Sequence, residues 1–225
     1  MGAVIGELLP LGVSVAISPI PIVAVILMLL SGQAARTSTG FLAGWVVGIV
    51  VVTVVVLVLV GQAASTSAGQ PSTASSVLKL VFGVLLLGLA VREWRERPKA
   101  GEAAEMPKWM STIDSFTFVK ALGLGVALSA VNPKNLVMCL AAGTTIGAAH
   151  LSGGEDAVAV AVFTVIAAST VAIPVIGYMT ARTKMTGPLE SLRNWLTQNN
   201  ATVMAVLLLV IGVVLLGKGI SGLTS

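Results

Sequence analysis

A lysine stands in the middle of a long apolar stretch, in the segment VNPKNL that covers residues 131–136. Lys134 is preceded by Pro133 and flanked by the carboxamides of Asn132 and Asn135. Ammonium and amide groups form hydrogen bonds, and a proline leaves the carbonyl four residues before it without its helical donor. These residue types predict a polar binding site at a break in an apolar helix, with a chemistry that suits an anionic ligand.

The composition places this segment in a membrane protein. Hydrophobic residues make up 56% of the 225-residue chain and charged residues only 10%, which is far from the composition of a soluble domain. Several apolar runs reach the length of about 20 residues that a membrane-spanning helix needs. We expect six spans, at 8–30, 41–60, 75–91, 119–142, 157–179 and 202–220. The first run lacks a basic segment before it and is too long for a cleaved signal peptide.

The basic residues indicate how the chain crosses the membrane. Lys and Arg occur in the connections after the first, third and fifth spans, and the other two connections contain neither. By the positive-inside rule the three basic connections are cytoplasmic, so both termini should be extracytoplasmic. The sequence pI of about 9.6 reflects this bias and does not indicate nucleic-acid binding. Contact with anionic lipid headgroups is a second role for the same residues.

Two pairs of segments indicate an internal repeat. The stretch LVFGVLLLGLAV at 80–91 aligns without gaps to LVIGVVLLGKGI at 209–220, with seven identical positions. The stretch AISPIPIV at 16–23 aligns to AVNPKNLV at 130–137. Three spans in each repeat would invert the second copy relative to the first, as in many secondary transporters.

The repeat predicts an all-α integral membrane fold of two inverted three-helix repeats. The first repeat would cover 1–100, a cytoplasmic linker 101–118, and the second repeat 119–225. Pro19 and Pro133 fall near the middle of the first and fourth spans, so we expect both helices to be broken there. Irregular backbone at this depth persists only inside protein or beside a water-filled cavity. The two breaks therefore predict a central site.

The predicted substrate site is formed by both breaks. It consists of Ser18, Pro19, Pro21, Asn132, Pro133, Lys134 and Asn135. A charge at the bilayer centre costs about 2.5–3.5 kcal/mol even on lenient insertion scales, and no Asp or Glu lies at the depth of Lys134. An anionic substrate group would balance this charge, or the lysine would cap the end of a broken half-helix. Weaker candidates for lining the same cavity are Thr164, Ser169, Thr170 and Pro174.

Other motifs argue against catalysis. The stretch GVVLLGKG at 212–219 resembles a phosphate-binding loop, but it lies within a span and ends in glycine instead of Ser or Thr. The single cysteine, Cys139, excludes a disulfide within the chain. His150 has no second histidine or acidic cluster near it to form a metal site. We expect no catalytic residue, no metal, no cofactor and no enzyme activity.

Two further stretches concern packing. Gly40, Gly44 and Gly48 share one helix face, which suits close helix packing within the subunit or the seam of a homodimer. In PKWMSTIDSF at 107–116, Trp109, Ile113 and Phe116 share a helical face, which predicts a short interfacial helix or a plain connector.

Four stretches resemble a known family. SPIPIVAVILMLLS, REWRERP, PKWMSTID and NPKNLVMCLAAGTTI look like the GAP family, the peptidoglycolipid- and sulfolipid-addressing (Sap-like) proteins of the lysine-exporter (LysE) superfamily. The resemblance covers nearly the whole chain. It implies a six-span bacterial inner-membrane protein of actinobacterial type that exports cell-envelope glycolipids. It also implies a lipid or glycolipid substrate and contact with envelope-lipid biosynthesis or export machinery.

The residues and the resemblance together favour a flippase-like exporter of a cell-envelope glycolipid, or of another amphiphile with an anionic or polyhydroxylated headgroup. A LysE-type exporter of a small solute such as an amino acid is the first alternative, although a site for a cationic solute should offer carboxylates and this one offers a cation. The second alternative is a non-transporting scaffold for envelope-lipid export, which would need no charge at its centre.

Overall fold

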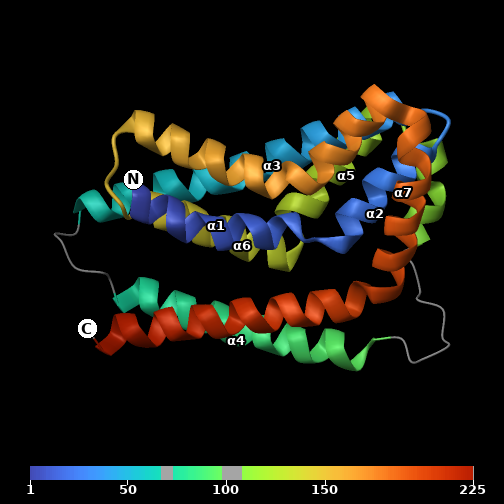
Figure 1. Cartoon of the computed structure of the whole chain (residues 1–225). Coiled ribbons are helices and arrows are strands. Elements are labelled where there is room, and N and C mark those ends of the chain that lie inside the picture. The colour runs from blue at the N-terminus through green and yellow to red at the C-terminus, as the bar shows by residue number, and fades with distance from the viewer. Residues whose placement is uncertain (67–72, 98–107, 225) are drawn as a thin grey trace. The chain divides into compact units, whose positions relative to one another are not determined.

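The computed structural model describes residues 1–66, 73–97 and 108–224, and every element within these ranges is a helix (Figure 1). The elements are α1 (Gly2–Ala16), α2 (Pro19–Leu30), α3 (Ala34–Thr66), α4 (Thr73–Arg95), the 3-10 helix η1 (Lys108–Ser115), α5 (Phe118–Ala130), α6 (Pro133–Gly147) and α7 (Gly153–Thr224). The prediction of an all-helical fold is confirmed for these residues.

The helices have the length and composition of a membrane protein. In the described ranges, α3 and α7 are long and apolar enough to cross a bilayer, and two bent helix pairs raise the number of candidate spans to four. The 72 residues of α7 are divided by a kink at Ala181, whose backbone is not helical, with φ −145° and ψ 51°. The apolar surface that these helices leave exposed suits hydrocarbon as a solvent.

The predicted breaks in the first and fourth apolar runs are confirmed. α1 and α2 meet at 54° and α5 and α6 at 67°, each pair across a short break. Pro19 and Pro133 are the first residues of α2 and α6. A proline is favourable at that position because the N–H it lacks would have no intrahelical partner. The chain therefore stops one helix and starts another at the places where the sequence predicts a break.

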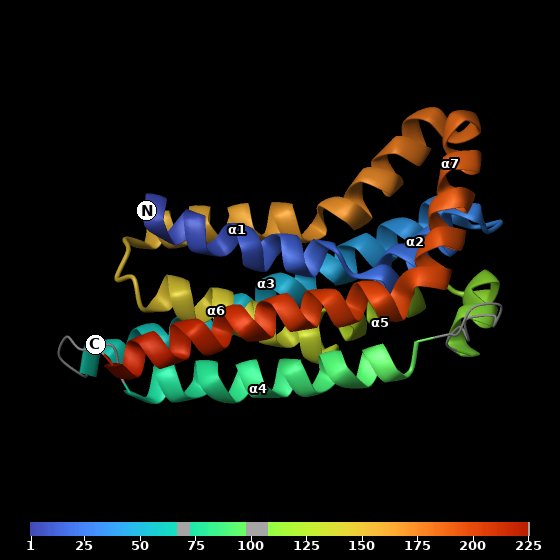
Figure 2. The ribbon, with the colours of Figure 1, turned by 60° about the horizontal axis from the view of Figure 1, so that its bottom comes forward.

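The helices pack as two compact units: residues 1–65 with 105–197, and residues 66–104 with 198–225. In the first unit α1 lies against α6, as the two views show (Figure 1 and Figure 2). In the second unit α4 lies beside the end of α7, whose Gly219 approaches Leu80. This division follows packing, whereas the predicted boundaries at residues 100 and 118 follow sequence similarity and stay a prediction.

The glycine face of α3 packs within the first unit. A Cβ added at Gly40 would lie 2.7 Å from the carbonyl oxygen of Phe118. At Gly44 it would collide with the carbonyl of Leu122. Gly125 of α5 approaches the α3 backbone in return. Small residues thus let two helix backbones come together, which accounts for the glycine spacing without a homodimer.

A second close crossing lies in the other unit and involves residues that the repeat alignment pairs. A Cβ at Gly83 of α4 would lie 2.7 Å from Cγ of Leu216, and a Cβ at Gly212 would lie 2.9 Å from Cδ2 of Leu87. The alignment matches Gly83 with Gly212 and Leu87 with Leu216. The contact is therefore the same from either helix, as a local two-fold relation requires.

The segment expected at the membrane interface is partly buried in protein. η1 lies against α2, and Met110 and Ile113 are only 6% and 2% exposed. The prediction that this apolar face meets lipid is wrong for Ile113, because η1 packs against α2 and buries that side chain. The side chain of Trp109, the other position of this prediction, lies outside the described residues.

Candidate functional site

The side chain of Lys134 is the centre of a buried polar cluster between α1, α2 and α6. It is 1% exposed. Its ammonium nitrogen Nζ donates to the carbonyl oxygen of Ser14 at 2.7 Å, to that of Ile17 at 3.0 Å and to Oγ of Ser18 at 2.7 Å. A lysine ammonium has three N–H donors, so each of them has an acceptor. All three acceptors lie within residues 14–18, in the last turn of α1 and in the break that follows it.

The acceptors exist because α1 stops at this depth. Pro21 has no N–H to give to the carbonyl of Ile17, which the ammonium takes instead. The N–H of Ser18 bonds to the carbonyl of Ala16 at 2.9 Å, so it does not serve the carbonyl of Ser14 in a helical bond. The ammonium thus caps the C-terminal end of α1, where the helix dipole is negative.

Ser18 links the lysine to the second break. Its Oγ lies 2.7 Å from the carbonyl oxygen of Val15, which Pro19 leaves without a helical donor, and 3.0 Å from Oδ1 of Asn135. The one hydroxyl hydrogen can go to either acceptor. Asn135 in turn donates from Nδ2 to the carbonyl of Leu128 on α5 at 3.1 Å. A chain of hydrogen bonds therefore joins both broken helices.

The remaining residues of the predicted site shape the breaks. Asn132 is the N-cap of α6, and its Oδ1 accepts from the backbone N–H of Lys134 at 3.0 Å. Pro133 is exposed, whereas Pro19 and Pro21 are buried. The structure thus brings the side chains of Ser18, Lys134 and Asn135 into contact and turns Asn132 to the backbone, while the three prolines mark the starts of α2 and α6.

The four weaker candidates lie in different places, and only one of them contacts the cluster. Thr170 of α7 joins the cluster, because its Oγ1 donates to the carbonyl of Ala16 at 2.6 Å. Ser169 bonds within its own helix to the carbonyl of Ile166 at 2.7 Å, and Pro174 is buried in α7. Thr164 lies in a separate groove between α3 and α7.

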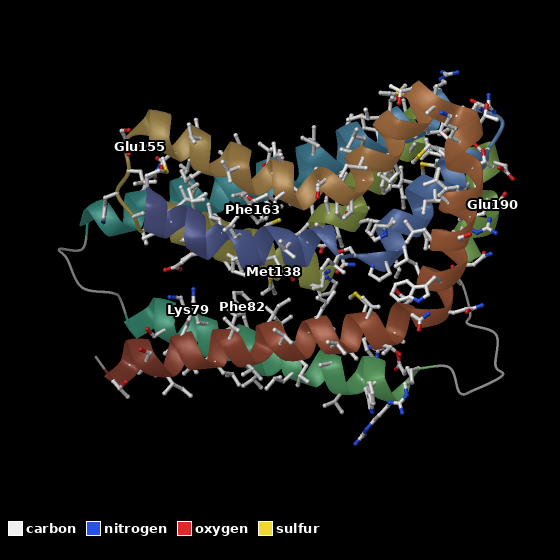
Figure 3. The ribbon with its side chains drawn as sticks, viewed as in Figure 1. Lys79, Phe82, Met138, Glu155, Phe163 and Glu190 are labelled. Carbon is white, nitrogen blue, oxygen red and sulfur yellow. The ribbon has the colours of Figure 1, made fainter. Side chains whose placement is uncertain are left out.

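Sequence reasoning missed the carbonyl of Ser14, although it accepts one of the two shortest bonds from Lys134. Serine at this position carries no signal, because the acceptor is its backbone. The orientation of Lys134 agrees with that of Met138 one turn further along α6, which is labelled in Figure 3 and has 0% exposure. Two side chains four residues apart on one helix share a face, so a buried Met138 indicates that Lys134 points inward.

The charge of Lys134 meets neutral oxygen atoms. In the described part of the chain no carboxylate lies within ion-pair distance of its ammonium, and no group of three His, Cys, Asp or Glu side chains gathers there as a metal site would require. Helix-end carbonyls solvate an ammonium but carry only partial charge. An anion that approached the ammonium would have to compete with these three acceptors.

The family described as "Sap, sulfolipid-1-addressing protein" matches residues 8–221, a stretch that includes both broken helices. No curated protein and no solved structure matches the chain. Since the matched residues cover nearly the full length, the chain belongs to the family of the sulfolipid-1-addressing protein Sap.

Proposed function

We propose that this protein is a flippase-like membrane exporter of a cell-envelope glycolipid, or of another amphiphile with an anionic or polyhydroxylated headgroup. The family to which the chain belongs is described as sulfolipid-addressing, which favours a lipid with an acidic headgroup. The observation that carries the proposal is the buried Lys134 ammonium, which joins two broken helices through neutral acceptors alone.

The proposed mechanism follows from the saturation of Lys134. Its three N–H donors all bond to the α1–α2 break, so an anionic headgroup group must displace at least one acceptor to bind. Displacement frees the end of α1 from α6. Substrate binding and helix movement are then coupled, because the anion favours the state in which Lys134 has released the end of α1. The lipid tail stays in the bilayer while the headgroup passes the breaks.

We further propose that the protein has six spans arranged as two inverted repeats. The paired breaks and the matched crossing of Gly83 with Gly212 are what two inverted repeats would produce. In this arrangement both termini are extracytoplasmic and the protein lies in the bacterial inner membrane. Its partners are the lipid substrate, the bilayer and the envelope-lipid export machinery. A homodimer is compatible with this arrangement and is not needed by it.

One observation favours a second candidate function, a non-transporting scaffold. Every donor of Lys134 is satisfied by the chain itself, as expected of a lysine that only caps α1. A LysE-type exporter of small solutes would use the same contact between Lys134 and the end of α1, with a different substrate. The three candidates differ in whether a lipid, a solute or nothing moves.

The test is a flux measurement on the full chain in liposomes. A sulfated glycolipid with a fluorescent acyl chain is placed in one leaflet, and its transfer is followed with a membrane-impermeant quencher. Lys134→Ala should abolish transfer, whereas Lys120→Ala should retain it, because Lys120 is exposed at the start of α5. Equal transfer by both folded variants, or none by the unaltered protein, would refute the exporter.

A further inference from the structure

A second candidate site lies away from the Lys134 cluster, in the first compact unit. A groove of about 570 Å³ runs between α3 and the first part of α7 and opens to one side. We call it the α3–α7 groove. Its lining includes Val50, Val54 and Leu57 of α3 and Asp156, Ala161 and Thr164 of α7. This volume lies within the range of about 300–1,000 Å³ that small-molecule sites have.

Two polar atoms interrupt the apolar lining of the groove. Oδ1 of Asp156 and Oγ1 of Thr164 are buried, and neither has a hydrogen-bond partner within the residues that the structure describes. Thr164 as a whole is 8% exposed. Buried polar atoms without partners are uncommon, because each forfeits the hydrogen bonds it makes in water. Both atoms therefore lack a hydrogen bond that a molecule bound in the groove would supply.

Thr164 differs from Thr144 and Thr180 and resembles Thr53 of α3, because its hydroxyl makes no hydrogen bond to its own helix. Thr144 and Thr180 donate to the carbonyl four residues earlier, at 2.8 Å and 3.0 Å. That bond satisfies a helical threonine without any outside partner. Thr164 makes no such bond. Its hydroxyl is free to donate into the groove.

The two atoms define the chemistry of the ligand. An ionised Asp156 accepts hydrogen bonds and cannot donate them, whereas the hydroxyl of Thr164 can donate. The two residues are eight positions apart on one helix, which corresponds to about 12 Å along its axis. Asp156 lies in the first turn of α7, beside the Glu155 labelled in Figure 3. Both helices that form the groove can cross a membrane, so hydrocarbon reaches its open side.

We propose that the α3–α7 groove binds an acylated polyol lipid. Hydroxyl groups of the headgroup donate to Asp156, a carbonyl at the root of the chain accepts from Thr164, and the alkyl chain lies over the valine and leucine side chains of α3. The carboxylate repels an acidic group, so the neutral hydroxyl-bearing part of the lipid faces it. The role of this groove in holding an exported lipid rests on the proposed function, but binding itself does not.

The experiment is photo-crosslinking of the full chain in lipid nanodiscs. The probe is a decanoyl ester of glucose with a diazirine in its chain, and the comparison probe is the methyl ester of the same acid. Mass spectrometry locates the labelled peptides. The sugar ester should label residues 50–57 and 157–165 about tenfold more than the methyl ester does, because hydrogen bonds to a charged acceptor distinguish the two probes.

Matched variants test the two polar atoms and the groove. Asp156→Asn should lower labelling by the sugar ester about tenfold, whereas Glu155→Gln should not, because the Glu155 carboxylate bonds to Ser152 at 2.9 Å outside the groove. Thr164→Val removes the hydroxyl at constant shape and should also lower labelling. Ala161→Phe should block the groove, and Val158→Phe, on an exposed side chain of the same helix, should not.

Equal labelling by the two probes would reduce the groove to a general lipid contact and overturn the inference, as would unchanged labelling of Asp156→Asn and Thr164→Val. Because labelling needs no transport, the two proposals can fail separately. A protein that labels as expected and transfers no lipid supports the groove and refutes the exporter. A protein that transfers lipid and shows no preference between the two probes supports the exporter and refutes lipid binding in the groove.

Discussion

The ammonium of Lys134 lies 2.7 Å from the hydroxyl oxygen of Ser18, across 116 positions of sequence. This hydrogen bond joins the first residues of two half-helices, since Ser18 is the N-cap of α2 and Lys134 lies in the first turn of α6. The same hydroxyl lies within hydrogen-bond distance of Asn135. Ser18 is therefore the side chain of the first break that contacts both Lys134 and Asn135 of the second.

Ser18→Ala should weaken both folding and transport. The variant removes an acceptor of Lys134 and leaves the buried carbonyl of Val15 without its donor, at a cost of about 1–3 kcal/mol. Ser31→Ala is the matched control, because the Ser31 hydroxyl makes the same 2.7 Å bond to a carbonyl three residues earlier but receives no ammonium. Thermal unfolding and lipid flux are measured on both. Equal losses would show that the bond to Lys134 contributes nothing.

Lys134→Met should lower stability by on the order of 2 kcal/mol. Removing the charge relieves about 2.5–3.5 kcal/mol of insertion cost, but it leaves three acceptors at the end of α1 without a donor, each at about 1–3 kcal/mol. The loss of acceptor bonds is the larger effect. Lys120→Met serves as control because Lys120 is exposed. A melting temperature above that of the unaltered protein would mean that the charge cost dominates.

The membrane orientation can be tested at glycines with open surroundings. A Cβ at Gly32, Gly154 or Gly187 has no heavy atom within 4 Å, so a cysteine fits at each. In a Cys139→Ala background, an impermeant thiol reagent added to intact cells should modify position 154 and leave positions 32 and 187 unmodified. The reason is the basic residues beside the latter two. Modification of position 32 before lysis would contradict extracytoplasmic termini.

Two glycines on α5 provide a test of the α3–α5 contact. A Cβ at Gly125 would collide with the backbone of Phe41 and lie 2.7 Å from the N of Trp45, whereas a Cβ at Gly123 meets nothing within 4 Å. Gly125→Ala should therefore destabilise the fold by about 1–3 kcal/mol. Gly123→Ala should be neutral or stabilise it by up to about 1 kcal/mol through helix propensity. The measurement is thermal unfolding of both variants in detergent. Equal melting temperatures would argue against the close approach of the α3 and α5 backbones.

Much of the site could be predicted because proline chemistry is local. Pro19 and Pro21 release the carbonyls of Val15 and Ile17 whatever the rest of the chain does, and both carbonyls are bonded by side chains of the cluster. The polarity of the VNPKNL segment likewise indicates that Lys134 and Asn135 are residues of the site. Local rules were sufficient to place the breaks and to name the side chains at them.

The parts that could not be predicted depend on contacts between distant segments. The carbonyl of Ser14 becomes an acceptor because Ser18 turns its N–H to Ala16, a conformation that the sequence does not specify. The segment around Ile113 is amphipathic, and its apolar face suits contact with lipid or with protein equally. The packing of η1 against α2 determines that Ile113 contacts protein. Thr164 resembles Thr170 in sequence, yet only Thr170 bonds to Ala16.

The capping of α1 by Lys134 has a consequence for biosynthesis. A ribosome completes α1 and α2 more than a hundred residues before it adds Lys134, and domains generally fold from the N-terminus during synthesis. During that interval the carbonyl of Ile17, which Pro21 cannot serve, lacks the donor that it has in the finished protein, and an unpaired carbonyl is costly in hydrocarbon. The nascent first helix pair must therefore stay near water, the translocon or a helper protein until α6 arrives, and its final seating in the membrane is a late event.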